Sequence, residues 1–486
     1  MASYTRLSAL DRSFLDIEKR NTHMHVGATC IYDAAPLRTA AGGIDIERVR
    51  AYIESRLHLI PRYRQHIAKI PFEGHPIWVD DDQFNIRYHV RHTSLPKPGD
   101  ERQLKRLAGW INSQQLDRGK PLWEMWMIEG LEGDRFAMIA KTHHCMIDGL
   151  AGADLLSVML RPSPDSEVDE PHQWHPRPAP SATRLVQDAI TRRLSLPLRA
   201  AKAVLTDPRQ VWQDASDLAA ALIESTSTSL RPASETPINR IIGSHRRFDW
   251  LTFDLDRVKA VKNHLGGTVN DVILTSVSGG IRDYLSRRGM PVDLEPDFVF
   301  RAFCPVGLHA SSRNGATGNF VSAMMADLPV DEASPVRRLA RIREFTRDHK
   351  DGAPVRGTEV LENLADLIYP PLISTFASTV ESSRAYNIIV TNVPGPQFPL
   401  YLLGARMLES YPLVPLFGHQ GVGIALLSYD GRLCWGFSAD RDIVPDLHDL
   451  VESVRAAFSE LCQAAGMTAL RPDGVSVVES RSDQVG

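Results

Sequence analysis

The order of apolar and polar positions in the first 160 residues predicts alternating strands and helices. An apolar run that begins near Met24 (MHVGATCIYD) has the length and the β-branched and aromatic content of a strand. Residues 100–115 carry Leu104, Leu107 and Ile111 at helical spacing, which predicts an amphipathic helix. The first part of the chain is therefore a mixed unit of strands and helices.

A predicted hairpin runs directly into a polar segment of this unit. Residues 121–129 (PLWEMWMIE) and 135–141 (RFAMIAK) are typical of two strands joined by the turn Leu-Glu-Gly-Asp, and residues 149–160 are typical of a helix. Two adjacent histidines, His143 and His144, lie between the second strand and that helix. Side chains at such a corner are held rigidly and can still reach a cleft.

Changes in composition mark the boundaries between larger units. Residues 161–182 are rich in Pro, Ser, Asp and His, and residues 183–224 have a mostly helical pattern that we expect to be broken near Pro197 and Pro208. We predict a first unit at 1–160, a Pro-rich linker and helical bridge at 161–235, a second unit at 236–470 and a disordered tail at 471–486.

Composition and charge are those of an ordinary soluble globular protein. Hydrophobic residues make up 43% of the chain and charged residues 23%, and the net charge of −4 argues against nucleic acid as a partner. The five cysteines include no Cys-x-x-Cys pair, which is typical of a reduced, cytosolic protein. The start of the chain lacks the pattern of a signal peptide, and residues 411–428, the nearest approach to an apolar span, are better explained as a buried strand pair.

The histidine pair offers the chemistry of general-base catalysis. A hydroxyl is a poor nucleophile at neutral pH, and a neutral imidazole can remove its proton as it attacks a carbonyl. Neighbouring residues on an extended segment point in opposite directions, so only one of the two histidines can face a given reactant. We assign His144 as the base and His143 as its support, with Asp148 orienting the corner through backbone N–H groups or an arginine.

Several other interpretations of this segment stay open at the sequence level. Asp148 also lies where the N-cap of the following helix belongs. Cys145 could be a nucleophile, although its neighbour His144 would point away from it. A metal site could draw on the two histidines, Asp148 and the His23-Met-His25 pair, but no His-Glu-x-x-His spacing is present. We expect no metal and no cofactor.

Several short blocks along the chain have a distinctive sequence. They are LSALDRSFL, MHVG at Met24–Gly27, PRYRQ at Pro61–Gln65, DRGKPLWEMW at Asp117–Trp126, HHCMIDG at His143–Gly149, TVNDVIL at Thr268–Leu274, GNFVSAM at Gly318–Met324, TNVPGP at Thr391–Pro396 and LSYDGRL at Leu427–Leu433. In these blocks and in their order, from about Leu7 to Leu470, the chain resembles the bacterial wax ester synthase/acyl-CoA:diacylglycerol acyltransferase family, in particular its actinobacterial triacylglycerol synthases.

The resemblance implies a fold and a set of site residues. The fold would be like chloramphenicol acetyltransferase, an α/β arrangement of two pseudo-related acyltransferase units with a tunnel at their interface. The base of the family maps onto His144, and the motif ends at Gly149. The family's Asn-Asp pair maps onto Asn270 and Asp271, which also fit the start of a helix and are as readily explained as a structural cap.

One departure from the family concerns the second unit. Relatives often have Pro-Val-Ser-x-Arg where this chain has Pro-Val-Gly-Leu-His, so that the serine is Gly307 and the arginine is His309. If this segment touches the acceptor or CoA, the substrate preference of the chain differs from theirs. The assignment of the base does not depend on it.

We therefore predict an acyl-CoA:diacylglycerol O-acyltransferase that uses long-chain acyl-CoA as a substrate. Wax ester synthesis on a fatty alcohol is the nearest alternative and would use the same chemistry. Transfer from a carrier protein, as in condensation domains, is disfavoured because no carrier segment is attached. A non-enzymatic coat of lipid droplets is disfavoured by the intact histidine motif.

The expected acceptor, diacylglycerol, also indicates where in the cell the protein acts. Diacylglycerol must be collected from a membrane or droplet surface, so we expect a cytoplasmic protein that is peripheral to the inner membrane or to lipid droplets. The helical bridge carries Arg192, Arg193, Arg199 and Lys202 among apolar residues, which favours a membrane-surface helix. The simpler interpretation is that the bridge packs on the rest of the protein.

Overall fold

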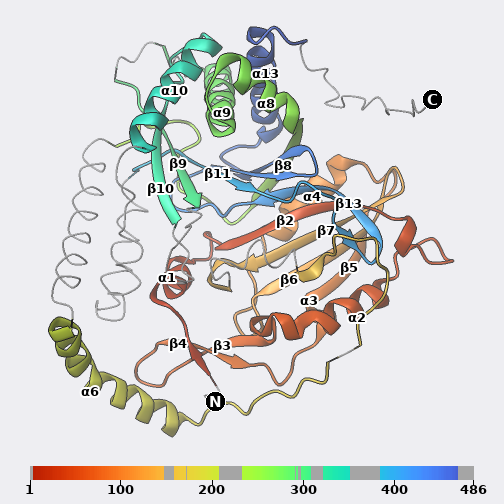
Figure 1. Ribbon diagram of the computed structural model, residues 1–486, viewed down its shortest axis with the longest axis vertical. Coiled ribbons are helices and arrows are strands. Elements are labelled where there is room, and N and C mark those ends of the chain that lie inside the picture. The colour runs from red at the N-terminus through yellow and green to blue at the C-terminus, as the bar shows by residue number, and fades with distance from the viewer. Residues whose placement is uncertain are drawn as a thin grey trace.

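A computed structural model describes most of the chain. The described residues are 4–146, 158–170, 172–206, 232–290, 292–293, 297–307, 321–350 and 384–468. Two six-stranded sheets and the helices beside them form the body of the molecule (Figure 1).

The first sheet has the strand order β12-β13-β2-β7-β6-β5. Its strands are β2 (His25–Asp33), β5 (Val90–Ser94), β6 (Trp123–Leu131), β7 (Arg135–His143), β12 (Tyr401–Leu402) and β13 (Ala405–Leu413). All of its pairings are antiparallel except β5 with β6. Strands β6 and β7 form the predicted hairpin, and β7 is buried along almost its whole length.

The second sheet has the order β10-β9-β11-β14-β15-β8. Its strands are β8 (Arg246–Asp254), β9 (Phe300–Gly307), β10 (Val321–Leu328), β11 (Ile388–Pro394), β14 (Val422–Tyr429) and β15 (Arg432–Asp440). Four helices lie beside it at the upper end of Figure 1: α8 (Leu255–Leu265), α9 (Val269–Arg287), α10 (Pro335–Lys350) and α13 (Leu447–Ala464). Apolar side chains of these helices and strands share one core.

Helix α4 (Glu101–Asn112) joins the two units. Asp100 and Gln103 close a capping box at its start, and its buried residues include the predicted Leu104 and Ile111. A Cβ atom at Gly109 would lie 2.9 Å from the carbonyl oxygen of Arg246, so a residue without a side chain allows α4 to approach β8 closely. The core around α4 draws on both sheets, which makes the interface a packed layer.

Strand β13 crosses from the second half of the chain into the first sheet. It pairs with β2, where Tyr411 lies opposite Thr29, and Tyr411 also stacks on Trp250 of β8 at 4.9 Å. Residues 405–413 therefore belong to the first sheet although β9 and β11 of the second sheet precede them in the chain. Residues 411–428 contain the end of β13 and most of β14, so two strands are present as expected, but they belong to different sheets and the expected pairing between them is wrong.

A small three-stranded sheet lies beside the first unit, in the order β1-β4-β3. Its strands are β1 (Thr5–Arg6), β3 (Gln65–Lys69) and β4 (Pro76–Asp80), and the nearby helices are α1 (Ala9–Ile17), α2 (Ile46–Arg56), α3 (Ile86–His89) and α6 (Ala182–Thr206). Short 3-10 turns occupy Ala35–Leu37, Leu57–Leu59, Pro61–Arg64 and, as η4, His144–Met146. Leu185 and Ala189 of α6 are buried against this small sheet.

Some sequence expectations change here. Helix α6 continues through Pro197, so the expected break there is wrong, and Pro208 lies outside the described residues. Most of the helix expected at 149–160 and all of the tail at 471–486 also lie outside them. No helix among the described residues is long and apolar enough to cross a membrane. The tunnel between the units stays a prediction.

Candidate functional site

The histidine corner is fixed by backbone hydrogen bonds on both sides. His143 is the last residue of β7 and lies opposite His25 of β2, while His144 begins the turn η4. The His143 N–H donates to the carbonyl of Leu122 at 2.9 Å, and the His144 N–H donates to the carbonyl of Met24 at 2.7 Å. The edge of the sheet therefore holds the main chain of both histidines.

His143 is fully buried and its ring has a defined proton position. Its Nδ1 accepts the N–H of Cys145 at 3.1 Å. A backbone N–H can only donate, so Nδ1 is the unprotonated nitrogen and the proton of the neutral ring is on Nε2. That Nε2 lies 3.5 Å from Oε1 of Glu18.

His144 is half-buried, and its ring packs on the ring of Phe14 in α1 with centroids 4.0 Å apart. Burial lowers the pKa of His144 to about 4, a contact with its own backbone carbonyl opposes this effect, and His143 adds to it. The imidazole is therefore neutral near pH 7. The two rings contact different groups, as expected for adjacent residues at the end of a strand.

Glu18 is a buried carboxylate that the sequence analysis missed. Its side chain is 1% exposed, and Oε2 accepts hydrogen bonds from Nε and Nη2 of Arg118 at 3.0 and 2.7 Å. Oε1 lies 3.6 Å from Nε2 of His25 and also accepts the N–H of Met24 at 3.4 Å. Burial by itself raises the pKa of Glu18, but His143 and Arg118 outweigh it and hold the pKa below its ordinary value.

A buried lysine ties the end of α4 to the same strand. Lys141 of β7 donates to the carbonyl oxygens of Ile111 and Gln114 at 3.1 and 2.8 Å, which stabilises the carboxyl end of α4. Burial lowers the pKa of Lys141 to about 8, although Glu124 opposes the shift. The end of α4 is therefore fixed relative to the histidine corner.

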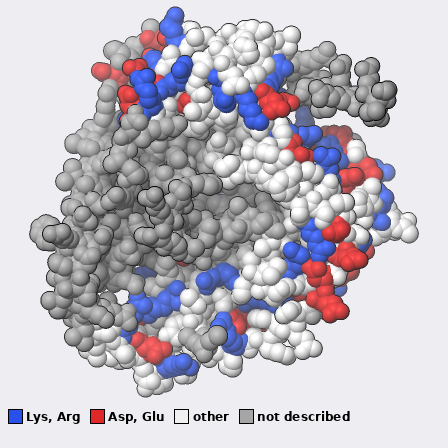
Figure 2. All heavy atoms as spheres, in the orientation of Figure 1, with Lys and Arg blue, Asp and Glu red and all other residues white. Residues whose placement is uncertain are grey.

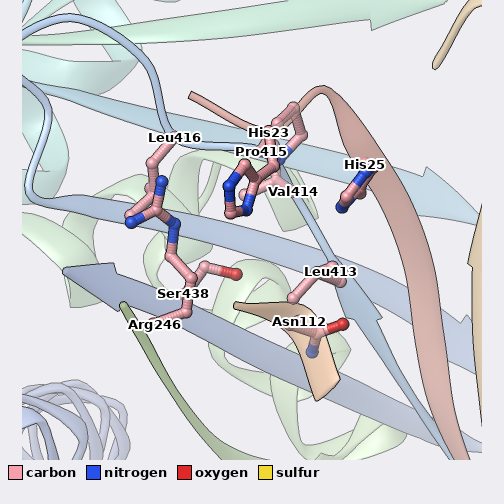
Figure 3. A pocket seen from close by; sticks show the side chains of 9 residues that line it. All are labelled: His23, His25, Asn112, Arg246, Leu413, Val414, Pro415, Leu416 and Ser438. Carbon is pink, nitrogen blue, oxygen red and sulfur yellow. The ribbon is translucent and has the colours of Figure 1, made fainter. Parts of the chain in front are cut away.

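A polar pocket lies where the two units meet (Figure 3). It is lined by His23, His25, Asn112, Arg246, Leu413, Val414, Pro415, Leu416 and Ser438. Four of its buried polar atoms have no hydrogen-bond partner: Nδ1 of His23, Nδ1 of His25, Oδ1 of Asn112 and Oγ of Ser438. Such atoms suit ordered water, and His144 is not among the lining residues.

Comparisons with known proteins match almost the whole chain. The family model for the wax ester synthase/diacylglycerol acyltransferase catalytic domain matches residues 7–273, and that for the C-terminal domain of the same family matches residues 317–462. The chain belongs to this family. The resemblance found in the sequence is thereby confirmed, and the chain is an acyltransferase.

Individual relatives and solved structures agree with this assignment. A putative diacylglycerol O-acyltransferase of Mycobacterium tuberculosis is 32% identical over 475 residues, covering 96% of this chain and 91% of the relative. A second one from that species, tgs1, is 32% identical over 94% of this chain and 95% of its own. The wax ester synthase/diacylglycerol acyltransferase of Marinobacter aquaeolei matches in structure with a TM-score of 0.68 and 25% identity, over 95% of this chain and all of the other.

More distant structures share the fold alone. A trichothecene 15-O-acetyltransferase from Fusarium sporotrichioides matches with a TM-score of 0.57 at 13% identity, over 94% of each chain. A starter condensation domain of rhizomide synthetase matches with a TM-score of 0.54 at 11% identity, over 97% of each chain. The predicted two-unit fold of a CoA-dependent acyltransferase is thereby confirmed.

The other site residues expected from the sequence are either in the second unit or outside the described residues. Asp148, Gly149 and His309 lie outside the described residues, and Gly307 ends β9. Asp271 is buried in the first turn of α9, where it forms a capping box with Thr268 and accepts the hydroxyl of Thr346 at 2.8 Å. The N-cap itself is Thr268, not the Asn-Asp pair, and Asn270 is half-buried beside it.

Two alternative chemistries at the corner find no support among the described residues of the acyltransferase. Burial raises the pKa of the Cys145 thiol far above its ordinary value, which disfavours the thiolate that a nucleophile requires. The described residues contain no group of three or more His, Cys, Asp or Glu arranged to hold a metal ion.

Proposed function

We propose that this acyltransferase transfers a long-chain acyl group from CoA to the free hydroxyl of diacylglycerol, with His144 as the general base. The observation that carries the proposal is the half-buried, neutral imidazole of His144 in the turn that directly follows β7. The mycobacterial relatives named diacylglycerol O-acyltransferases support the choice of acceptor. No cofactor is required, because acyl-CoA is itself the acyl donor.

The mechanism requires one nitrogen of the His144 ring to carry a lone pair. In this mechanism the proton of the neutral His144 ring is on Nδ1, which is buried and has no hydrogen-bond partner among the described residues. Nε2 then carries the free lone pair. The acceptor hydroxyl gives its proton to Nε2 as its oxygen attacks the thioester carbonyl, the tetrahedral oxyanion collapses, and the proton passes from Nε2 to the departing CoA thiolate.

His143 serves in this proposal as a support and not as a second base. It is fully buried, and its Nδ1 is already occupied by the N–H of Cys145. We retain Asp148 as a residue that orients the corner and Gly149, Asn270 and Asp271 as structural members of their motifs. The capping box of Asp271 supports the structural role.

The same chemistry would serve a fatty alcohol, and the family name covers both acceptors. An assay of the purified protein with palmitoyl-CoA against dispersed diacylglycerol and hexadecanol separates the two. We expect triacylglycerol as the main product and slower formation of wax ester. Wax ester alone would identify a wax ester synthase, and neither product would reject the proposed function.

We further propose that the protein meets its acceptor at a lipid surface through α6 and the hairpin between β3 and β4. Phe72 at the hairpin tip is fully exposed and has a φ of 63°, a conformation that is strained for an aromatic residue. Ile190 and Leu194 lie one turn apart on α6 and are 53% and 72% exposed. Arg193 is close enough to lower the pKa of Glu73, the neighbour of Phe72, although Arg6 has a larger effect.

Charge around this surface favours an anionic partner. Arg6, Lys69, Arg184, Arg192 and Arg193 lie on β1, β3 and α6, against two acidic residues, Glu73 and Asp188. Figure 2 shows several Lys and Arg side chains in the lower part of the view, where α6 and the small sheet lie in Figure 1. Exposed apolar side chains next to basic ones are typical of proteins that bind membrane surfaces. This supports a cytoplasmic protein that is peripheral to the inner membrane or to lipid droplets.

A further inference from the structure

We infer that Glu18 is a positioning residue for the acyl transfer, acting through His143 on the turn that carries His144. This inference rests on the proposed function for its catalytic consequence. The geometry behind it stands by itself: Oε1 of the buried Glu18 lies 3.5 Å from Nε2 of His143, a charge–dipole contact that is longer than a regular hydrogen bond, and Nδ1 of His143 accepts the N–H of Cys145 in η4.

Glu18 joins segments that are far apart in the chain. It follows α1 directly, His143 ends β7, and Arg118 lies between α4 and β6. Oε2 of Glu18 takes both Arg118 hydrogen bonds, so Oε1 is left to face His143 at 3.5 Å and His25 at 3.6 Å. Arg118 also donates to the carbonyl of Leu15 at 2.9 Å, which fixes the carboxylate to the last turn of α1.

The proton on His143 links the carboxylate to the turn. With its proton on Nε2, His143 can point an N–H at Glu18 and a lone pair at the N–H of Cys145 at the same time. The other tautomer would place Nδ1–H against the Cys145 N–H, and Nε2 would face the carboxylate as a lone pair. Glu18 thus favours the one tautomer that anchors residue 145, directly after His144.

The charged neighbours of Glu18 keep it ionised. Arg118 pairs with it directly, and Lys141 of β7 contributes from the same face of the sheet. Burial, the Lys141 ammonium and His143 hold the pKa of His25 well below its ordinary value, so His25 is a neutral neighbour. Between the two neutral tautomers of His143, a carboxylate in this position favours the one with its N–H on Nε2, towards Oε1 of Glu18.

The test compares Glu18→Gln with Asp80→Asn. Asp80 is a matched control because it is also a buried carboxylate, with a side chain 6% exposed that is bonded to Arg177 and Gln65 in the small sheet. We expect Glu18→Gln to lower kcat about tenfold or more while KM for palmitoyl-CoA changes less than about threefold, because the base is displaced and CoA binding is not. Asp80→Asn should keep the wild-type kcat per folded molecule.

A second measurement does not depend on activity. Backbone hydrogen exchange of overlapping peptides that end at residues 144, 145 and 146 reports the Cys145 amide. We expect faster exchange at this amide in Glu18→Gln and wild-type exchange in Asp80→Asn. Unchanged exchange together with wild-type kcat would overturn the inference, and so would equal losses of kcat in both variants. If the wild type transfers no acyl group, the proposed function fails, and the exchange result alone decides whether Glu18 positions the turn.

Discussion

At the scale of single residues, the two adjacent histidines differ in what they can reach. His143 is fully buried, whereas His144 is half-buried and its ring packs on Phe14. His144 is therefore the one of the two that we assign to contact the reactant. The neutral state of His144 near pH 7 makes its lone pair available throughout the physiological range.

Substitution of the two histidines should separate their roles. We expect His144→Ala to lose roughly 10²–10⁴-fold in kcat/KM with little change in melting temperature, because it removes a general base from a half-buried position. His143→Ala should lose less activity and more stability, because it removes a buried ring that bonds the Cys145 N–H. Steady-state kinetics and thermal melting of both variants check this. Equal activity losses with wild-type melting behaviour would contradict the division of roles.

The sequence identified the histidine pair but not the carboxylate behind it. The motif has fixed spacing and unusual composition, so it can be recognised locally. Glu18 carries no such signal, because its partners Arg118 and His143 lie 100 and 125 positions further along the chain. Only the pairing of β2 with β7, and the position of α1 beside η4, bring them together. A long-range contact of this kind has no counterpart in local spacing.

At the scale of elements, the start of α9 gives a direct test of the Asn-Asp motif. Asp271 accepts the Thr268 N–H and the Thr346 hydroxyl while buried, so Asp271→Ala should lower the free energy of unfolding by about 0.5–2 kcal/mol. Thr268→Ala should fall in the same range, because it removes the other half of the capping box. Urea denaturation measures both, and activity should follow the folded fraction. A fully stable Asp271→Ala protein without activity would instead place this residue in the chemistry.

Elements with strong local patterns were predictable, and those set by tertiary contacts were not. Helix α4 and the β6–β7 hairpin follow from apolar spacing, capping and turn residues. Helix α6 passes through Pro197 in spite of the local cost that proline imposes on a helix. Strand β13 joins the first sheet because its register with β2 and its stacking on Trp250 decide its place, and neither can be read from its own residues.

At the scale of the whole molecule, buried histidines should make stability depend on pH. Burial is the largest cause of lowered pKa values for His23, His25, His75, His89 and His144, and the pKa values of the last three fall to about 4. The folded state then binds fewer protons than the unfolded state wherever pH lies below the unfolded value of about 6.5. The contribution of these histidines to the free energy of unfolding is therefore fully present above that pH and is lost as pH falls towards about 4.

Thermal melting between pH 7.5 and 4.5 tests this dependence. We expect the melting temperature to be nearly constant above pH 7 and to fall steadily below pH 6.5, with an uptake of protons on unfolding. His89 is buried, stacks on Trp123 at 4.5 Å and has no role in the proposed chemistry, so it serves as the test position. His89→Gln should be less stable at pH 7.5 and lose less stability on acidification than the wild type. Equal pH slopes would contradict the assignment to buried histidines.

The proposed lipid surface predicts two separable contributions to membrane binding. Each basic residue near an anionic surface contributes about 1 kcal/mol and is screened by salt, whereas insertion of apolar side chains is insensitive to salt. We expect the wild type to co-sediment with liposomes that contain anionic lipid and to be partly released at high salt. Replacing Arg192, Arg193, Arg199 and Lys202 by Ser should remove the part that salt releases. The double variant Phe72→Ser/Leu194→Ser should weaken the liposome binding that persists at high salt.

A matched control decides whether these effects belong to the surface of α6 and the β3–β4 hairpin. Phe398 lies between β11 and β12 and is 51% exposed, so Phe398→Ser removes an exposed aromatic ring outside the proposed surface. It should bind liposomes as the wild type does, and all variants should acylate detergent-dispersed diacylglycerol at nearly the wild-type rate, since we assign none of these residues to the chemistry. Wild-type binding by both the basic and the apolar variants would leave α6 with only its packing role on the small sheet, where Leu185 and Ala189 are buried.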